Sequence, residues 1–527
     1  MRKQSFLHGA LILMLAGLIN RIVGFVLRVI LVRMIDVEGL GLFQMVYPLF
    51  LTLLLICTAG FPIAITKLIP ERLAARDQRG VFGLFKTSLC FTSLLSIIIA
   101  LALFFSAEKI ADLIYRDQRV YYILLASIPA LLISPLAASF RGFFQGMHNM
   151  IPTAASQITE QLSRGLATIM LVGMFAELGL KYQAAGIALG LSVGELVGFL
   201  VLVIILISSY FSPAAFFKKL LPHKKETSPA KYRHGFFFYL KSISQLAVPI
   251  TLGRILNALM LSGEAVLIPR QLQVAGFSLK EATSLYGQLS GMVEQLIFFP
   301  TVITIALTIS LIPNISDAHA RNDLTRIKNH YQDVVRVTTY LGMPVTVIFW
   351  TRGEELCQLL FGYPTAGSIL AVMAFSAFFI YYLQVSHGML NGLGKPQLAL
   401  LNLSLGSLIK LIGIFYLTRL PELGIKGAAV SIGLGYVLAS ILNFIVIGHN
   451  IGYGLNLLQC FIKPLLASFC LFLFNQRLEL LFDLLPFQLD FRLEIVLILL
   501  SLILVYLLIM LLTGTITEQD IRRFKQR

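Results

Sequence analysis

The stretch Gly9–Met34 reads GALILMLAGLINRIVGFVLRVILVRM and is long and apolar enough to cross a bilayer. Arg21 lies near its middle, beside Asn20, and Arg28 follows seven residues later. A cation near the centre of a spanning helix costs about 2.5–3.5 kcal/mol on insertion scales. Arg21 and Arg28 share one helical face, so we expect this face to line a water-filled interior. Arg33 is close enough to the helix end to reach an interface, and the same interfacial position is the alternative for Arg28.

The composition of the whole chain agrees with this reading of its first helix. Its 527 residues are 57% apolar and 13% charged, unlike those of a soluble globular domain. Apolar runs of about twenty residues recur throughout, which predicts an all-α polytopic membrane protein with about fourteen transmembrane helices. The first helix is expected to be retained, because no short apolar core with a small-residue cleavage site is present. The predicted spans are 6–34, 41–66, 83–106, 119–143, 157–178, 184–210, 243–269, 284–312, 334–351, 367–391, 399–419, 427–448, 460–481 and 493–513.

The net charge of +16 is distributed unevenly along the chain. Basic residues gather in alternate loops, within 67–86, 218–241 and 321–336, and in the tail at 522–525. The positive-inside rule therefore predicts a multi-pass protein of the cell membrane with both termini in the cytoplasm. No nucleic-acid-binding signature accompanies the charge, so we expect no nucleic acid partner.

Short matches recur in the same order in the two halves of the chain, which indicates an internal repeat. They pair Leu68-Ile69-Pro70 with Leu311-Ile312-Pro313, Arg141-Gly142 with His387-Gly388, Gly186-Ile187-Ala188 with Gly427-Ala428-Ala429, and Asn20-Arg21-Ile22 with Gly253-Arg254-Ile255. Repeats of six helices point the same way across the membrane, which predicts two pseudo-symmetric six-helix lobes with a transport path between them. The predicted domains are an N-lobe at 1–210, a basic cytoplasmic linker at 211–242, a C-lobe at 243–450, a helix pair at 451–515 and a basic cytoplasmic tail at 516–527.

Polar residues inside the predicted spans are the candidates for a substrate site in the cleft. Two or more arginines suit an anionic ligand, because guanidinium binds phosphate in a bidentate manner. The candidate substrate-binding residues are Asn20, Arg21, Arg28, Arg254 and Asn257. An ion pair between Arg254 and a glutamate inside the membrane is an open alternative.

Acidic residues in the spans give a second set of candidates. Glu195, Glu264 and Glu294 are candidates for coupling transport to sodium ions or protons, with structural hydrogen bonding as the alternative for Glu195. Lys410 could join the polar lining with Glu294. Glu160 and Arg164 are four residues apart and are expected to form an ion pair within one lobe.

Enzyme signatures are absent from the sequence. It contains no P-loop, no G-x-S-x-G element and no His/Cys cluster with metal spacing, and its five cysteines are scattered through apolar segments. We therefore expect a protein that is not an enzyme and that needs no cofactor or metal.

One stretch carries a family resemblance. Residues 139–152 read SFRGFFQGMHNMIP and are followed by QITEQ at 157–161, with KQSFL at 3–7 and SLIPNIS at 310–316. These residues resemble the stage V sporulation protein B family, a branch of the multidrug/oligosaccharidyl-lipid/polysaccharide exporter superfamily that is similar to MurJ-type lipid II flippases. The resemblance implies fourteen helices and alternating access for an undecaprenyl-pyrophosphate-linked precursor used in spore cortex peptidoglycan synthesis.

The resemblance also bears on the candidate site. The family's first-helix R-x-x-G-F pattern matches Arg21, Gly24 and Phe25, whereas the second-helix arginines of MurJ-type proteins have no counterpart between residues 46 and 66. Arg254 is therefore our candidate for the second cation. The expected partners are a lipid-linked cell-wall precursor, membrane lipids and cell-wall synthases. The alternatives are a flippase for exopolysaccharide or teichoic-type oligosaccharides, a cation-coupled drug antiporter, and a non-transporting scaffold for cell-wall synthesis.

Overall fold

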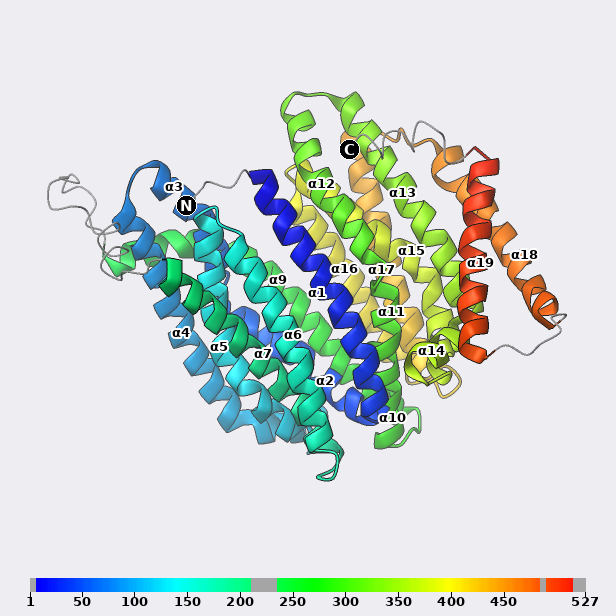
Figure 1. The fold of residues 1–527 in the computed structure, drawn as a ribbon, viewed down its shortest axis with the longest axis horizontal. Coiled ribbons are helices and arrows are strands. Elements are labelled where there is room, and N and C mark those ends of the chain that lie inside the picture. Colours follow the sequence, from blue (N-terminus) through cyan, green and yellow to red (C-terminus); the bar gives the residue numbers. More distant parts are fainter. Residues whose placement is uncertain (1–5, 210–234, 484–489, 515–527) are drawn as a thin grey trace. The chain divides into compact units, whose positions relative to one another are not determined.

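A computed structural model describes residues 6–209, 235–483 and 490–514, and the described chain is built from helices without a β-strand (Figure 1). The first helices are α1 (Phe6–Met34), α2 (Val37–Thr58), α3 (Phe61–Ala74), α4 (Gln78–Lys109), the π-helix η1 (Ile110–Tyr115), α5 (Val120–Gly146), α6 (Ile151–Met174), α7 (Leu180–Ser209) and α9 (Phe236–Val274). They are followed by α10 (Leu279–Gln288), the π-helix η3 (Leu289–Val293), α11 (Glu294–Phe298), α12 (Thr301–Ala320), α13 (Leu324–Thr351) and α14 (Gly353–Phe361). The last are α15 (Thr365–Gly392), α16 (Pro396–Leu417), α17 (Ile425–Ile451), the π-helix η4 (Leu458–Ile462), α18 (Lys463–Asp483) and α19 (Phe491–Leu512).

Thirteen helical segments of the described residues are long and apolar enough to cross a membrane. The prediction of an all-α polytopic membrane protein is thereby confirmed. Helix α6, which contains most of the predicted span 157–178, is not among the thirteen. It places Gln157, Glu160, Gln161 and Arg164 within two turns, which lowers its mean hydropathy.

Two predicted spans differ from the structure because the helix breaks inside them. The span 41–66 is divided between α2 and α3, where Ala59 and Gly60 both adopt positive φ angles, of 45° and 71°. Pro62 occupies the first turn of α3, a position at which its missing N–H costs nothing. The span 284–312 is similarly divided, and Pro300 immediately precedes α12.

The first of two compact units comprises Met1–Val266. One of its hydrophobic cores joins α3, α4 and α5 to the beginning of α9, through buried residues such as Ile65, Phe143 and Tyr239. Gly83 permits this approach, since a Cβ atom there would lie 2.3 Å from the Tyr239 ring. The first 31 residues of α9, up to Val266, thus pack with the helices of the first unit.

The second unit comprises Leu267–Arg527 and has its own core, formed by α12, α13, α15 and α17. The C-terminal pair α18 and α19 packs on α13 in a further apolar cluster. The Arg352 guanidinium, 5% exposed, donates its Nε proton to Asn475 Oδ1 at 2.8 Å and an Nη2 proton to the Asn475 carbonyl at 3.2 Å. Trp350 stacks on Phe472 at a centroid distance of 5.2 Å, so α18 is fastened to α13 by both polar and aromatic contacts.

Some predicted segments lie outside the described residues. They include most of the linker at 211–242 and the whole tail at 516–527. The domain boundaries and the cytoplasmic placement of these segments therefore stay predictions.

Candidate functional site

Helix α1 carries three of the predicted substrate-binding residues. Arg21 is exposed, and Asn20 and Arg28 are half-buried. Asn20 Oδ1 and Arg28 Nη1 are buried atoms without a hydrogen-bond partner among the described residues. A buried polar atom that lacks a partner is uncommon and calls for a water, an ion or a ligand. The polar positions of α1 therefore have unused hydrogen-bonding capacity.

The packing of α1 on α6 fixes where these polar groups lie. Gly24 faces Gln161, since a Cβ atom at Gly24 would lie 3.1 Å from the Gln161 amide nitrogen. One turn further along, Leu27 fills the space above Gly165. Two glycines, one on each helix, thus allow α1 and α6 to approach closely, as small residues commonly do in membrane helix pairs.

Helix α9 carries the remaining predicted substrate-binding residues, all within the first unit. Arg254 is exposed and makes no ion pair or hydrogen bond with any described residue, although it lies in the membrane-spanning segment Thr251–Val274. The alternative in which Arg254 pairs with a glutamate is thus not observed in this conformation. Asn257 is half-buried, and Glu264, at 6% exposure, is buried one turn before the helix enters the second unit.

A buried charge network joins α5, α6 and α7. Glu160 on α6 accepts hydrogen bonds from Arg141 Nη2 of α5, at 2.5 Å, and from Arg164 Nη2 one turn along α6. Arg164 Nη2 also lies 3.6 Å from Glu195 Oε1 of α7. The predicted ion pair between Glu160 and Arg164 is confirmed. Two arginines and two glutamates compensate one another's charge, so the network ties three helices together without a net charge.

Glycine and serine bring the helices of this network into contact. The Ser156 hydroxyl donates to the Gly198 carbonyl at 2.9 Å and accepts from Arg141 Nη2 at 3.1 Å. A Cβ atom at Gly194 would lie 2.6 Å from Arg164 Cβ, so α6 and α7 touch along their backbones. Glu195, adjacent to Gly194, retains a buried Oε2 atom without a hydrogen-bond partner among the described residues. The role of Glu195 in ion coupling stays a prediction.

The second unit contains a polar group of its own. Lys410 of α16 is 4% exposed, and its Nζ atom lies 5.3 Å from the centroid of the Tyr436 ring on α17. The Tyr436 ring in turn packs edge-on against Phe298 of α11, one turn after Glu294. Glu294 is half-buried and directly follows the π-helix η3, a type of distortion that is common at functional sites. The sequence identified Lys410 and Glu294 but gave no indication of the aromatic residues beside them.

Arg141 is a charged residue of the buried network whose role the sequence did not predict. Its only signal was its place in the distinctive segment SFRGFFQG, which was read as a repeat and family marker. Its partner Glu160 is 19 residues away on the next helix, and helical periodicity predicts contacts only within one helix.

Comparisons with known proteins give the chain its family. Residues 6–319 match the family model described as polysaccharide biosynthesis protein. Stage V sporulation protein B of Bacillus subtilis (strain 168) is 33% identical over 445 residues, which are 84% of this chain and 83% of that protein. The lipid II flippase MurJ of the same organism is 25% identical over 482 residues, 86% of this chain and 85% of that protein.

The fold has a match among solved structures. A structure of the lipid II flippase MurJ in an inward closed conformation aligns with a TM-score of 0.69 at 13% sequence identity, covering 95% of this chain and 98% of that one. At this identity the likeness concerns the fold alone. The family itself is shown by the family model and by the relative at 33% identity. The chain belongs to the polysaccharide biosynthesis protein family, in the branch that resembles stage V sporulation protein B and MurJ.

Proposed function

We propose that this protein is an alternating-access flippase that moves an undecaprenyl-pyrophosphate-linked peptidoglycan precursor from the inner to the outer leaflet of the cell membrane. The observation that carries the proposal is Arg254, an exposed cation in a membrane-spanning segment that no described carboxylate neutralises. Arg21 on α1 is a second exposed cation in a membrane span. The relatives named for sporulation and for lipid II flipping support this class of substrate.

The energetic argument concerns what surrounds these guanidinium groups. Facing hydrocarbon, each would cost about 2.5–3.5 kcal/mol or more. Facing a water-filled space, each is available to a ligand, and a guanidinium fork matches the oxygens of a phosphate. A pyrophosphate has several such oxygens and at least two negative charges, so it is suited to cations on two different helices. Asn20, Asn257 and Arg28 would add hydrogen bonds from the same two helices.

The same charges suggest how the transporter is reset after release of the headgroup. A cation that moves across the whole membrane potential exchanges about 2.3 kcal/mol per 100 mV. We propose that the potential drives the unloaded, cationic site back toward the cytoplasm, where the next pyrophosphate neutralises it. Ion coupling through Glu195, Glu264 or Glu294 is the competing mechanism, and the dependence of the rate on sodium ions and pH distinguishes the two.

The finer assignments follow the family branch. We propose the spore cortex as the destination of the precursor, cell-wall synthases as the acceptors of the flipped lipid, and cytoplasmic locations for both termini. We also propose that residues 1–210 and 243–450 form the two lobes that rock, and that 451–515 form an additional helix pair.

The decisive experiment reconstitutes the purified protein in liposomes with fluorescent lipid II and measures its accessibility to a membrane-impermeant quencher. Arg21→Glu and Arg254→Glu should each abolish translocation, because charge reversal repels the pyrophosphate. Arg254→Lys retains a positive charge but not the planar fork, and should keep part of the rate. Arg33→Glu reverses a charge at the end of α1 and is the matched control.

Full translocation by the double variant Arg21→Glu/Arg254→Glu would refute the proposed site. Translocation of a teichoic-type lipid-linked oligosaccharide in preference to lipid II would retain the mechanism but change the substrate. Each variant is accepted only if it inserts in the membrane and elutes from size exclusion like the wild type.

A further inference from the structure

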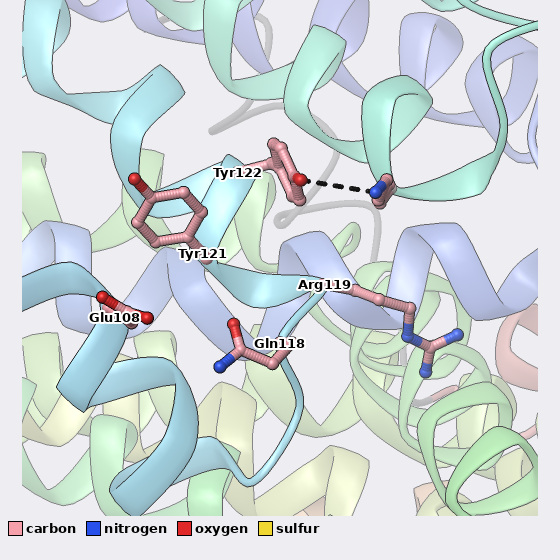
Figure 2. A pocket seen from close by; sticks show the side chains of 6 residues that line it. Glu108, Gln118, Arg119, Tyr121 and Tyr122 are labelled. Atoms are coloured by element: carbon pink, nitrogen blue, oxygen red, sulfur yellow. Dashed lines mark hydrogen bonds between the residues drawn. The ribbon is translucent and has the colours of Figure 1, made fainter.

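The first unit contains a pocket at the ends of its helices (Figure 2), and none of the candidate substrate-binding residues lines it. Its volume is about 330 Å³, within the range of small-ligand sites. It lies where α4 ends, where α5 begins and where α7 begins. The lining residues are Glu108, Gln118, Arg119, Tyr121, Tyr122 and Lys181. In the predicted topology this is the side opposite the basic loops, at the outer face of the membrane.

Arg119 forms ion pairs with two carboxylates. Its Nε and Nη2 atoms donate to Asp117 at 2.9 and 2.8 Å, and its Nη1 atom donates to Glu38 at 2.5 Å. The hydrogen bonds to Asp117 and Glu38 raise the pKa of Arg119 against the effect of burial. This residue ties the start of α2 to the start of α5, and its charge is compensated by these two carboxylates.

Lys181, by contrast, is a positive charge held in place by aromatic rings alone. Its Nζ atom lies 4.4 Å from the centroid of the Tyr122 ring and 5.0 Å from that of Tyr182. It donates to the Tyr122 hydroxyl at 3.4 Å, the contact drawn in Figure 2. Among the described residues no carboxylate pairs with it. Cation–π contacts orient the ammonium group and leave it N–H donors for an anion.

Glu108 supplies an unpaired charge of the opposite sign. It is the penultimate residue of α4, is exposed, and forms no ion pair or hydrogen bond with the described residues. The pocket therefore presents one free anion and one free cation, with the Tyr121 ring and the Gln118 side chain also in its lining. A ligand that carries both charges complements this lining, whereas a purely anionic ligand is repelled by Glu108.

An apolar surface leads along α4 to this pocket. Leu94, Ile98, Leu101 and Phe105 are 59%, 52%, 53% and 77% exposed, and they follow one another at intervals of four and three residues. Residues at these intervals form one face of a helix, and Glu108, three residues after Phe105, continues that face. An acyl chain lying on this face would bring its headgroup to Glu108.

We propose that the pocket binds the headgroup of a zwitterionic phospholipid of the phosphoethanolamine type from the outer leaflet. The phosphate meets Lys181, the primary ammonium donates to Glu108, and one acyl chain covers the exposed face of α4. Phosphoethanolamine is favoured over phosphocholine because only a primary ammonium donates hydrogen bonds to the carboxylate. This site goes beyond the proposed function, because it concerns membrane lipid rather than the transported precursor.

The test is native mass spectrometry of the intact protein, released from nanodiscs that contain equal amounts of phosphatidylethanolamine, phosphatidylcholine and phosphatidylglycerol. The wild type should retain phosphatidylethanolamine in preference to the other two. Glu108→Gln should reduce this preference about tenfold, the effect of losing one charge-assisted hydrogen bond, because only the ammonium of phosphatidylethanolamine donates to Glu108. Lys181→Met should instead reduce the retention of all three lipids, because each of them has a phosphate. Lys109→Met and Glu177→Gln make the same charge changes at exposed positions outside the pocket and should leave the preference intact.

Equal retention of the three lipids by the wild type would overturn the proposal. A preference for phosphatidylglycerol would also overturn it, because it would indicate a site for anions alone. Should a pocket variant misfold, the wild type still decides the question, because soluble glycerophosphoethanolamine should displace the bound lipid and glycerophosphocholine should not. No precursor is present in these measurements, so their outcome is independent of whether the protein flips lipid II.

Discussion

The Thr52 hydroxyl of α2 lies 3.0 Å from the Ser262 hydroxyl of α9, although 210 residues separate them along the chain. The two segments also approach closely at Gly60, where a Cβ atom would lie 2.3 Å from Thr251 Oγ1. These contacts hold α9 against the helices of the first unit at two levels. An alternating-access cycle in which α9 moves with residues 243–450 has to break them.

Cross-linking the first of these contacts should stop transport. In the variant Thr52→Cys/Ser262→Cys, an oxidant should form a disulfide that fixes α9 on α2, and translocation should fall to background. A reductant should restore it. The single variants, treated in the same way, control for the five native cysteines. A cross-linked protein that flips lipid at the full rate would show that α9 and α2 do not separate during the cycle.

Gly60 should not tolerate a side chain. Its φ of +71° lies in the left-handed region, and a new Cβ would meet both Thr251 Oγ1 and the Ala247 carbonyl, the latter at 3.0 Å. Gly60→Ala should therefore destabilise the protein by about 1–3 kcal/mol, from backbone strain and overpacking. A melting curve followed by thiol-reactive dye would detect this as a lower Tm. Gly17→Ala adds a Cβ where no atom lies within 4 Å and should leave the Tm unchanged or higher.

Removing the Arg141 side chain should lower the free energy of unfolding, because it leaves a buried carboxylate with less compensation of its charge. Arg141→Met deprives Glu160 of one of its two guanidinium partners, and breaking a buried pair costs about 3–5 kcal/mol. In Arg141→Met/Glu160→Gln the uncompensated charge is also gone, so this double variant should be less destabilised than the single one. Unfolding midpoints in increasing denaturing detergent measure both. Arg419→Met removes an exposed arginine and should have little effect, and equal losses for Arg141→Met and Arg419→Met would contradict the assignment.

The start of α10 should respond to acid. Ser278 and Glu281 form a capping box, and the hydrogen bonds from the Ser278 backbone N–H and hydroxyl lower the pKa of Glu281. Because the folded-state pKa is depressed, the stabilisation is complete above the unfolded-state pKa and is lost as the pH falls through the folded-state value. Protection of the amides at the start of α10 against hydrogen exchange, corrected for intrinsic rates, should therefore fall at acidic pH. Glu281→Gln should remove this pH dependence, and an unchanged dependence would exclude the capping box as its source.

Apolar runs were sufficient to predict the helices, because a bilayer requires each span to be long and continuous. The interruptions within those runs were harder to predict. Pro62 and Pro300 lie at two of these breaks, but the left-handed residue Ala59 gave no signal, since alanine strongly favours helices. The short helix α14 was missed as well. Breaks of this kind depend on which side chains pack around the helix. Those side chains come from distant parts of the chain, so the periodicity of one segment does not reveal them.

The candidate site shows the same limit. The pair Glu160 and Arg164 was predictable because both residues lie on one helix at a spacing of four. Arg141 and Glu195 join that pair from two other helices, and only tertiary packing brings them there. The roles of Arg21, Arg28 and Arg254 in substrate binding stay predictions until translocation is measured.

The hydrogen bonds between Arg352 and Asn475 constrain how a chain of this kind can lose its last two helices in evolution. The Arg352 side chain donates two hydrogen bonds to one asparagine of α18, and Arg352 is 5% exposed. A gene shortened before α18 would remove both of these acceptors from the buried cation, while its ion pair with Glu355 at 3.0 Å would remain. Loss of the last two helices therefore requires a compensating change at Arg352 in the same lineage. Shorter homologues that lack the pair are expected to have an uncharged residue at this position.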